Sequence, residues 1–106
     1  MVFKIKQHGG YSTATATEAL GDDNLYLVGK IVETQYEYID NKPTKNVTGY
    51  QVWVATDNQN PFKVKFLEDK PDLSGLAIGD VVVFDQLEAI QIKSNVYFRA
   101  TGIQKG

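Results

Sequence analysis

The stretch Gly49-Tyr-Gln-Val-Trp-Val-Ala-Thr56, followed by Pro61-Phe-Lys-Val-Lys-Phe-Leu67, decides how this chain is expected to fold. Both segments alternate with a period of two, which is typical of a β-strand with one buried face. The valine and phenylalanine side chains form the expected core face. The opposite face carries Trp53, the one tryptophan of the chain, near Lys63 and Lys65. An aromatic ring flanked by ammonium groups on an open sheet suits single-stranded nucleic acid, because bases stack on the ring and phosphates meet the lysines.

Further strand patterns flank this pair and cover residues 25–39, 80–85 and 96–103. Gly29 lies inside the first of them, where a glycine indicates a bulge or a bend. A long first strand that bends and serves two sheets is one way to close a small barrel. Residues 40–46 are rich in turn-forming residues and predict a polar loop.

The segments between the later strands are expected to be short. Residues 72–79 predict a helix of one or two turns, because Asp72 can cap it and Gly79 can end it. Residues 86–95 predict a connection that is extended in part and turns at Ser94-Asn95. The sequence thus predicts an all-β protein with a short helix between its third and fourth strands.

The N-terminal part of the chain has a different pattern. Residues 2–7 alternate and could form a short strand, whereas residues 8–24 contain little apolar sequence and predict an irregular arm. The Thr-Ala repeat at residues 13–17 could extend into β structure, and Glu18-Ala-Leu20 is too short for a stable helix alone. We therefore expect an N-terminal strand or arm over residues 1–24 and a barrel over residues 25–106.

Composition limits the class of protein. With 106 residues, 42% of them hydrophobic and 23% charged, the chain fits one globular domain. It contains no cysteine, which excludes disulfides and zinc–thiolate sites. No apolar run approaches the roughly 20 residues of a membrane-spanning helix. No membrane partner is therefore expected, and the expected location is the cytoplasm.

The sequence contains none of the motifs that would indicate catalysis. It has no nucleophile elbow, no phosphate-binding glycine loop before a helix and no metal-ligand spacing. Neither an enzyme nor a cofactor or metal is expected. The net charge of −2 counts against a nucleic-acid-binding role, although a local basic surface matters more than the total charge.

Three strands, a short helix and two more strands, with a glycine in the first strand, resemble the order of an OB-fold barrel. Gly79-Asp80, leading into Val81-Val-Val-Phe84, is similar to the turn into the fourth strand of many OB proteins. The resemblance covers roughly residues 25–104. Within this fold, the chain looks most like the small single-stranded DNA-binding proteins of phages and conjugative elements.

This resemblance implies a five-stranded OB-type barrel that binds single-stranded DNA without sequence preference, with RNA as a possible ligand. The implied role is replication or transfer of a small genetic element, by a homodimer or higher homo-oligomer. Those families use aromatic and basic residues on the first three strands and in the loops after strands one and four. Here these places hold Tyr36, Tyr38, Lys42, Lys45, Trp53, Lys63, Lys65 and Lys93.

Arg99 is a further candidate, because it shares a strand face with Tyr97 and could bind a phosphate, stack on a base or form a salt bridge. Each candidate also has a structural interpretation. Trp53 could be a packed core residue, the tyrosines could be ordinary strand residues, and the lysines could be solubilising charges. The alternative function is a non-enzymatic protein-interaction or structural barrel of a phage or conjugation assembly, which the acidic pI of about 5.3 suits.

Overall fold

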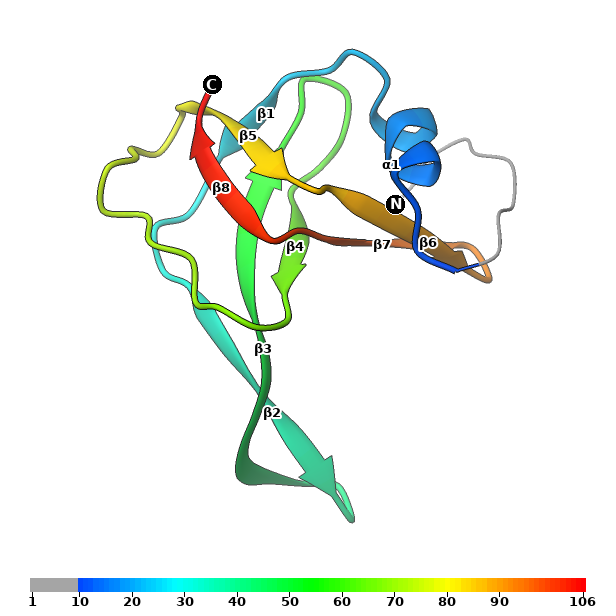
Figure 1. Cartoon of the computed structure of the whole chain (residues 1–106), viewed down its shortest axis with the longest axis vertical. Helices are drawn as coiled ribbons and strands as arrows, with labels where there is room; N and C mark the ends of the chain where they lie inside the picture. The colour runs from blue at the N-terminus through cyan, green and yellow to red at the C-terminus, as the bar shows by residue number, and fades with distance from the viewer. Residues whose placement is uncertain (1–9) are drawn as a thin grey trace.

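The computed structural model describes residues 10–106 and shows a mostly β protein with one short helix (Figure 1). The helix, α1, is Thr13–Leu20. The strands are β1 (Leu25–Leu27), β2 (Glu33–Ile39), β3 (Lys42–Ala55), β4 (Phe62–Phe66), β5 (Val81–Asp85), β6 (Glu88–Ile92), β7 (Asn95–Arg99) and β8 (Gly102–Lys105). The strand expected at residues 2–7 lies outside the described residues. Within residues 10–106, no helix is long and apolar enough to cross a membrane.

The strands form one mixed sheet that curls into a half-barrel. Its order is β6-β7-β4-β3-β1-β5-β8, and β2 pairs with β3 off this path. The β4–β7 pair is parallel and the other pairs are antiparallel. Between β7 and β8, the amide of Ala100 donates to the carbonyl of Lys65 at 2.9 Å, and the amide of Thr101 donates to that of Asp85 at 2.9 Å. The segment between β7 and β8 thus passes from pairing with β4 to pairing with β5 at two consecutive residues, Ala100 and Thr101. We call this point the crossing.

The prediction of a closed five-stranded barrel is wrong, because two of its expected strands are broken. The expected strand 25–39 becomes β1 and β2, and pairing stops at residues 28–32, around Gly29. The expected last strand becomes β7 and β8. The expected connection 86–95 contains β6, which forms a hairpin with β7 through a turn at Lys93-Ser94.

The expected short helix at residues 72–79 is also wrong. The carboxylate of Asp72 accepts a hydrogen bond from the backbone N–H of Ser74 at 2.9 Å, two residues on, and so forms a turn instead of a helix cap. This hydrogen bond also lowers the pKa of the Asp72 carboxyl. Leu73 and Leu76 are buried and anchor the segment to the core without helical structure.

The helix occurs instead in the segment predicted to be an irregular arm. Ser12 caps it: its backbone is extended, and its hydroxyl accepts a hydrogen bond from the amide of Thr15 at 3.1 Å. Gly21, with a φ of 57°, ends it. Ala16 and Leu20 are buried in the core, and α1 packs against β6. The helix therefore forms through its cap and its packing rather than through its length.

The core lies on the inner face of the curled sheet, and its predicted pattern is confirmed. Val52, Val54, Phe62, Val64 and Phe66 are all buried. The rings of Phe62 and Phe98 stack obliquely with centroids 4.9 Å apart, so the parallel β4–β7 pair is also packed through its side chains.

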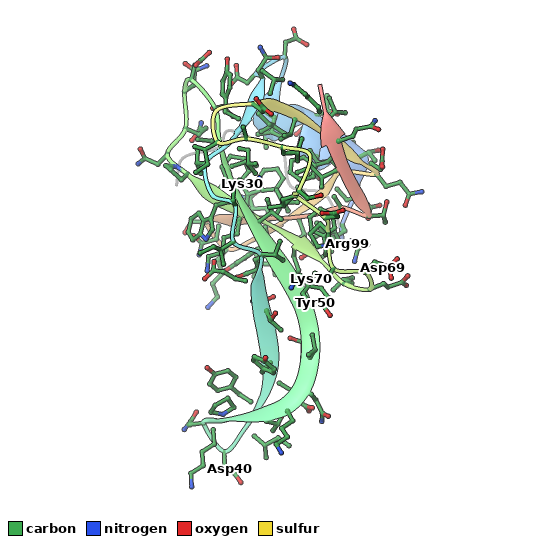
Figure 2. The ribbon with its side chains drawn as sticks, turned by 90° about the vertical axis from the view of Figure 1, so that its left-hand side faces the viewer. Lys30, Asp40, Tyr50, Asp69, Lys70 and Arg99 are labelled. Atoms are coloured by element: carbon green, nitrogen blue, oxygen red, sulfur yellow. The ribbon has the colours of Figure 1, made fainter. Side chains whose placement is uncertain are left out.

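A two-stranded hairpin projects from this body; we call it the arm, and it is distinct from the N-terminal residues 1–24. It consists of β2 and the first half of β3, and Asp40 lies at its far end (Figures 1 and 2). Asp40 and Asn41 have φ values of 52° and 64°, which is typical of a type I′ hairpin turn. The predicted polar loop 40–46 is thus mostly strand, and only its first two residues form the turn.

Candidate nucleic-acid interface

The outer face of the sheet carries a groove of about 590 Å³ along β3, β4 and β7. We call it the outer groove. Besides the buried Phe62 and Phe98, three partly exposed aromatic side chains and two cations lie along it, together with Gln35 and Gln51: Tyr11, Trp53, Tyr97, Lys63 and Lys65. The sequence predicts Trp53 and the two lysines for this face, and the structure brings these three together.

Trp53 is half-buried on the outer face and not in the core. Its indole N–H donates a hydrogen bond to Oε1 of Glu33 on β2 at 2.5 Å. Lys63, its direct cross-strand neighbour on β4, places its ammonium nitrogen 5.0 Å from the centre of the Trp53 ring. The ring is therefore oriented by a carboxylate and contacted by a cation, while part of its surface remains open to solvent.

Lys65 is half-buried next to Lys63 on the same strand face. Its alkyl chain lies over Gly49 on β3: a Cβ built on Gly49 would lie 2.8 Å from Lys65 Cε and 2.9 Å from the carbonyl oxygen of Phe66. The absence of a side chain at position 49 thus lets β4 and the lysine chain lie close to β3. Along the parallel pair, Lys65 is in register with Arg99.

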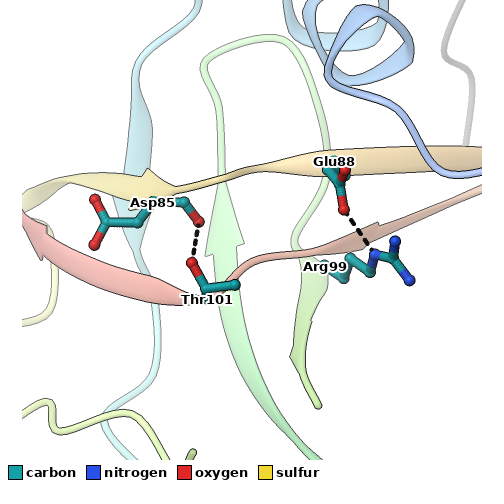
Figure 3. A network of polar contacts seen from close by, with 4 residues as sticks. All are labelled: Asp85, Glu88, Arg99 and Thr101. Atoms are coloured by element: carbon teal, nitrogen blue, oxygen red, sulfur yellow. Dashed lines mark hydrogen bonds and ion pairs between the residues drawn. The ribbon is translucent and has the colours of Figure 1, made fainter. Parts of the chain in front are cut away.

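Arg99 is engaged in an ion pair. Its Nε donates to Oε1 of Glu88 at 2.9 Å, as Figure 3 shows beside the Thr101–Asp85 hydrogen bond. Its guanidinium also lies over the ring of Tyr11, 4.0 Å from the ring centre. Arg99 on β7 thus contacts both Glu88 on β6 and the ring of Tyr11, which precedes α1. These contacts hold Tyr11 at the groove.

The other predicted site residues lie elsewhere. Lys42 and Lys45 are exposed on the arm, and Lys93 lies in the β6–β7 turn with a φ of 58°. Tyr36 and Tyr38 are also on the arm, but strand alternation places them on the ribbon face opposite Gln35, which lines the groove, and Glu33, which accepts the hydrogen bond from Trp53. The nine predicted residues therefore occupy four places, namely the outer groove, the Arg99–Glu88 ion pair, the arm and the β6–β7 turn, and do not form one surface.

Sequence reasoning missed Tyr11 and assigned no role to Tyr97. Tyr97 is 48% exposed, and its strand parity with Arg99 is visible in the sequence. Tyr11 has no such signal, because it reaches the groove only when α1 docks on β6 and Ser12 bridges to Ala89.

A second hollow, of about 390 Å³, lies beside the ion pair and has an acidic lining that includes Glu68, Asp69 and Glu88. In the part of the chain that the structure describes, no three His, Cys, Asp or Glu residues are grouped closely enough to hold a metal ion.

Comparison with known proteins identifies no relative: no protein-family model, curated protein or solved structure matches this chain. The functional interpretation rests on the geometry of the described residues.

Proposed function

We propose that the outer groove binds single-stranded DNA without sequence preference, with RNA as a possible second ligand. The observation that carries this proposal is the gathering of Tyr11, Trp53 and Tyr97 with Lys63 and Lys65 along one outward-facing groove. Bases stack on aromatic rings with on the order of 1–3 kcal/mol each, and lysines release counterions from the phosphate backbone. Binding of this kind needs no catalytic group, cofactor or metal.

The strand pairing supports an OB-type fold for this chain, and we propose this fold together with the function. β3 pairs with both β1 and β4, β4 pairs in parallel with β7, and β5 pairs with β1 and β8. An OB fold is a partly open Greek-key barrel whose second and third strands bind oligonucleotides on their outer face. In this chain β3 and β4 take those positions, and they carry Trp53 and the two lysines.

The contacts of Trp53 suggest how a base enters. The ammonium group of Lys63 lies over the ring, so a stacking base takes the place of this cation. The displaced ammonium then pairs with a phosphate of the same strand, while Glu33 keeps the indole oriented. The proposed biological setting is replication or transfer of a small genetic element in the cytoplasm.

An oligonucleotide titration followed by fluorescence tests the proposal, since Trp53 is the one tryptophan of the chain. We expect quenching by a single-stranded oligonucleotide, and we expect the affinity to fall as salt rises. The Trp53→Phe variant, followed by anisotropy of a labelled oligonucleotide, should still bind because a ring remains. A wild-type chain that shows neither quenching nor an anisotropy change would rule out the groove as a nucleic-acid site.

The alternative function, a protein-interaction or structural subunit of a phage or conjugation assembly, is favoured by a different feature. The arm and its base expose Ile31, Tyr38 and Ile39, at 81%, 67% and 54%. Exposed apolar side chains mark protein contacts where they gather into one patch, and Tyr38 and Ile39 are adjacent at the end of β2. A gel shift with a single-stranded oligonucleotide at two salt concentrations separates the two functions, because only DNA binding gives a shift that weakens with salt.

A further inference from the structure

The outer edge of β2 is open. Among residues 10–106, β2 pairs only with β3, and over Glu33–Ile39 its charged residues are Glu33 and Glu37, with neither lysine nor proline on the edge. We propose that a second copy of this chain covers this edge, and that two β2 strands pair antiparallel across a two-fold axis. The two arms then form one four-stranded ribbon, β3-β2-β2-β3.

The hairpin geometry determines which backbone groups of β2 face the open edge. Ile39 and Lys42 flank the two-residue turn and so form its hydrogen-bonded pair. The carbonyl of Glu37 also points towards β3, because it accepts a hydrogen bond from the Thr44 hydroxyl at 2.9 Å. The β2–β3 register shifts between Gln35 and Tyr36 and between Tyr36 and Tyr38, but the extra residues lie on β3. The backbone groups of β2 therefore still alternate, and those of Tyr36 point outwards.

The same alternation applies to the neighbours of Tyr36. Tyr38 lies opposite Pro43, which has no N–H and cannot form a hydrogen-bonded pair with it. The backbone groups of Tyr38 therefore also point to the open edge, and Thr34 follows by the period of two. Three consecutive outward positions are thus available to a second strand.

One register uses the whole of β2. When Tyr36 pairs with Tyr36 of the second copy, Thr34 pairs with Tyr38, and all the outward backbone groups exchange hydrogen bonds. In this register Glu33 lies opposite Ile39, and Glu37 lies opposite Gln35. No carboxylate lies directly opposite another, although the strand has two, so this register avoids repulsion between directly paired residues across the two-fold axis.

The side chains give a reason for association. Tyr36, Tyr38 and Val47 lie on one face of the arm and are 45%, 67% and 48% exposed. A two-stranded ribbon is marginally stable in water, whereas additional strands with a shared apolar face stabilise it. In the proposed register, the tyrosines of the two copies become cross-strand neighbours on this face and remove apolar surface from water.

The experiment uses the full chain, which contains no cysteine, so a single introduced thiol reports one position. Tyr36→Cys puts two thiols on directly paired residues, whose Cα atoms in such a pair are about 5.5 Å apart, within disulfide range. Ile39→Cys is the matched control: it is equally exposed on the same strand, but its copies would lie about 20 Å apart. Under mild oxidation, Tyr36→Cys should convert to a covalent dimer, and Ile39→Cys should remain a single chain.

A second measurement needs no variant. Sedimentation of the wild-type chain without nucleic acid should give twice the chain mass, and dilution should shift it towards a single chain. A wild-type chain that stays monomeric at every concentration overturns the proposal, as does equal cross-linking of the two variants. If the free chain is monomeric and Tyr36→Ala weakens oligonucleotide binding, then nucleic acid covers this face and the proposal is also overturned.

Discussion

Trp53 combines a fixed orientation with an accessible ring. Its N–H is held by Glu33, its neighbour Lys63 lies over the ring, and the side chain points away from the core. An indole in this setting needs little rearrangement before a base stacks on it, and preorganised groups of this kind bind with a smaller loss of side-chain entropy.

We expect Trp53→Ala to separate binding from folding. Loss of the stacking surface should weaken oligonucleotide binding by roughly 1–3 kcal/mol. The stability loss should stay below the roughly 3–5 kcal/mol that truncation of a core tryptophan costs, because Trp53 lies on the outer face. A thermal melt and a titration of the same sample check both values. A destabilised variant with unchanged affinity would mean that the ring only supports the sheet.

Lys63 and Lys65 test the electrostatic part of binding. Each lysine that neutralises a phosphate of a single strand contributes about 0.7 to the slope of log affinity against log salt. The double change to Gln should therefore reduce the slope by somewhat more than one unit, equally for different base sequences. The measurement is a salt titration of oligonucleotide affinity. The wild-type slope in the double variant would show that the strand follows another path, such as the lysines of the arm and Lys93.

Gly49 should be intolerant of a side chain. A methyl group there would come within 3 Å of Lys65 Cε and the Phe66 carbonyl oxygen, and the carbonyl belongs to paired backbone. Gly49→Ala is expected to lower the free energy of unfolding by about 1–3 kcal/mol, as overpacked sites do. Gly75→Ala is the matched control, because a Cβ there meets no atom within 4 Å. It should leave urea unfolding nearly unchanged or shift it to slightly higher urea.

At the scale of elements, α1 links the N-terminal residues to the groove. Ser12 both caps the helix and bridges to Ala89 on β6, directly after Tyr11. The position of the Tyr11 ring therefore depends on a properly started helix.

We expect Ser12→Ala to destabilise the protein by about 1 kcal/mol, because the amide of Thr15 loses its acceptor. Thr13→Ala, an exposed change in the same turn, should be close to neutral. Urea unfolding measures both. An equal effect of the two changes would show that helix propensity, and not the cap, stabilises α1.

The elements that the sequence predicts correctly are those defined by local alternation. β4 and the body of β3 alternate strictly, and their buried core faces match the prediction. β5 was predicted from its short apolar run at residues 81–84. The helix was predicted at the wrong place because its threonine-rich sequence has low helix propensity, and its apolar side chains are stabilised only by contact with β6. At residues 72–79, the side chain of Asp72 closes a local turn, which competes with the helix it could have capped.

The residues of the candidate site divide in the same way, into those that local alternation predicts and those that non-local contacts bring in. Trp53, Lys63 and Lys65 share a face through the parity of two adjacent strands, which sequence shows. Tyr97 joins them through a parallel pairing, and Tyr11 joins them through a docked helix, and both contacts are non-local. The tyrosines of the arm were grouped with Trp53, but their own strand parity opposes that of Glu33, the residue that holds the indole.

At the scale of the whole molecule, the crossing at Ala100 and Thr101 has a consequence for the time course of folding. These two amides bond to carbonyls on strands that are separated along the chain, at Lys65 and Asp85. The Ala100 bond needs β4 and the Thr101 bond needs β5, so both are present only after the final segment has met both strands, which requires long loops to close. The hairpins β2–β3 and β6–β7, in contrast, need only short turns and can form within about 1–10 μs.

We therefore expect refolding from urea to be dominated by a slow phase of milliseconds to seconds, the range of β proteins with many non-local contacts. Pulse-labelling hydrogen exchange should find the amides of the β6–β7 hairpin protected before those of Ala100 and Thr101. Simultaneous protection of all these amides would mean that the crossing belongs to the folding nucleus. In the expected order, the crossing is the step that completes the fold, and until then the open edges of β4 and β5 are exposed to pairing with other chains.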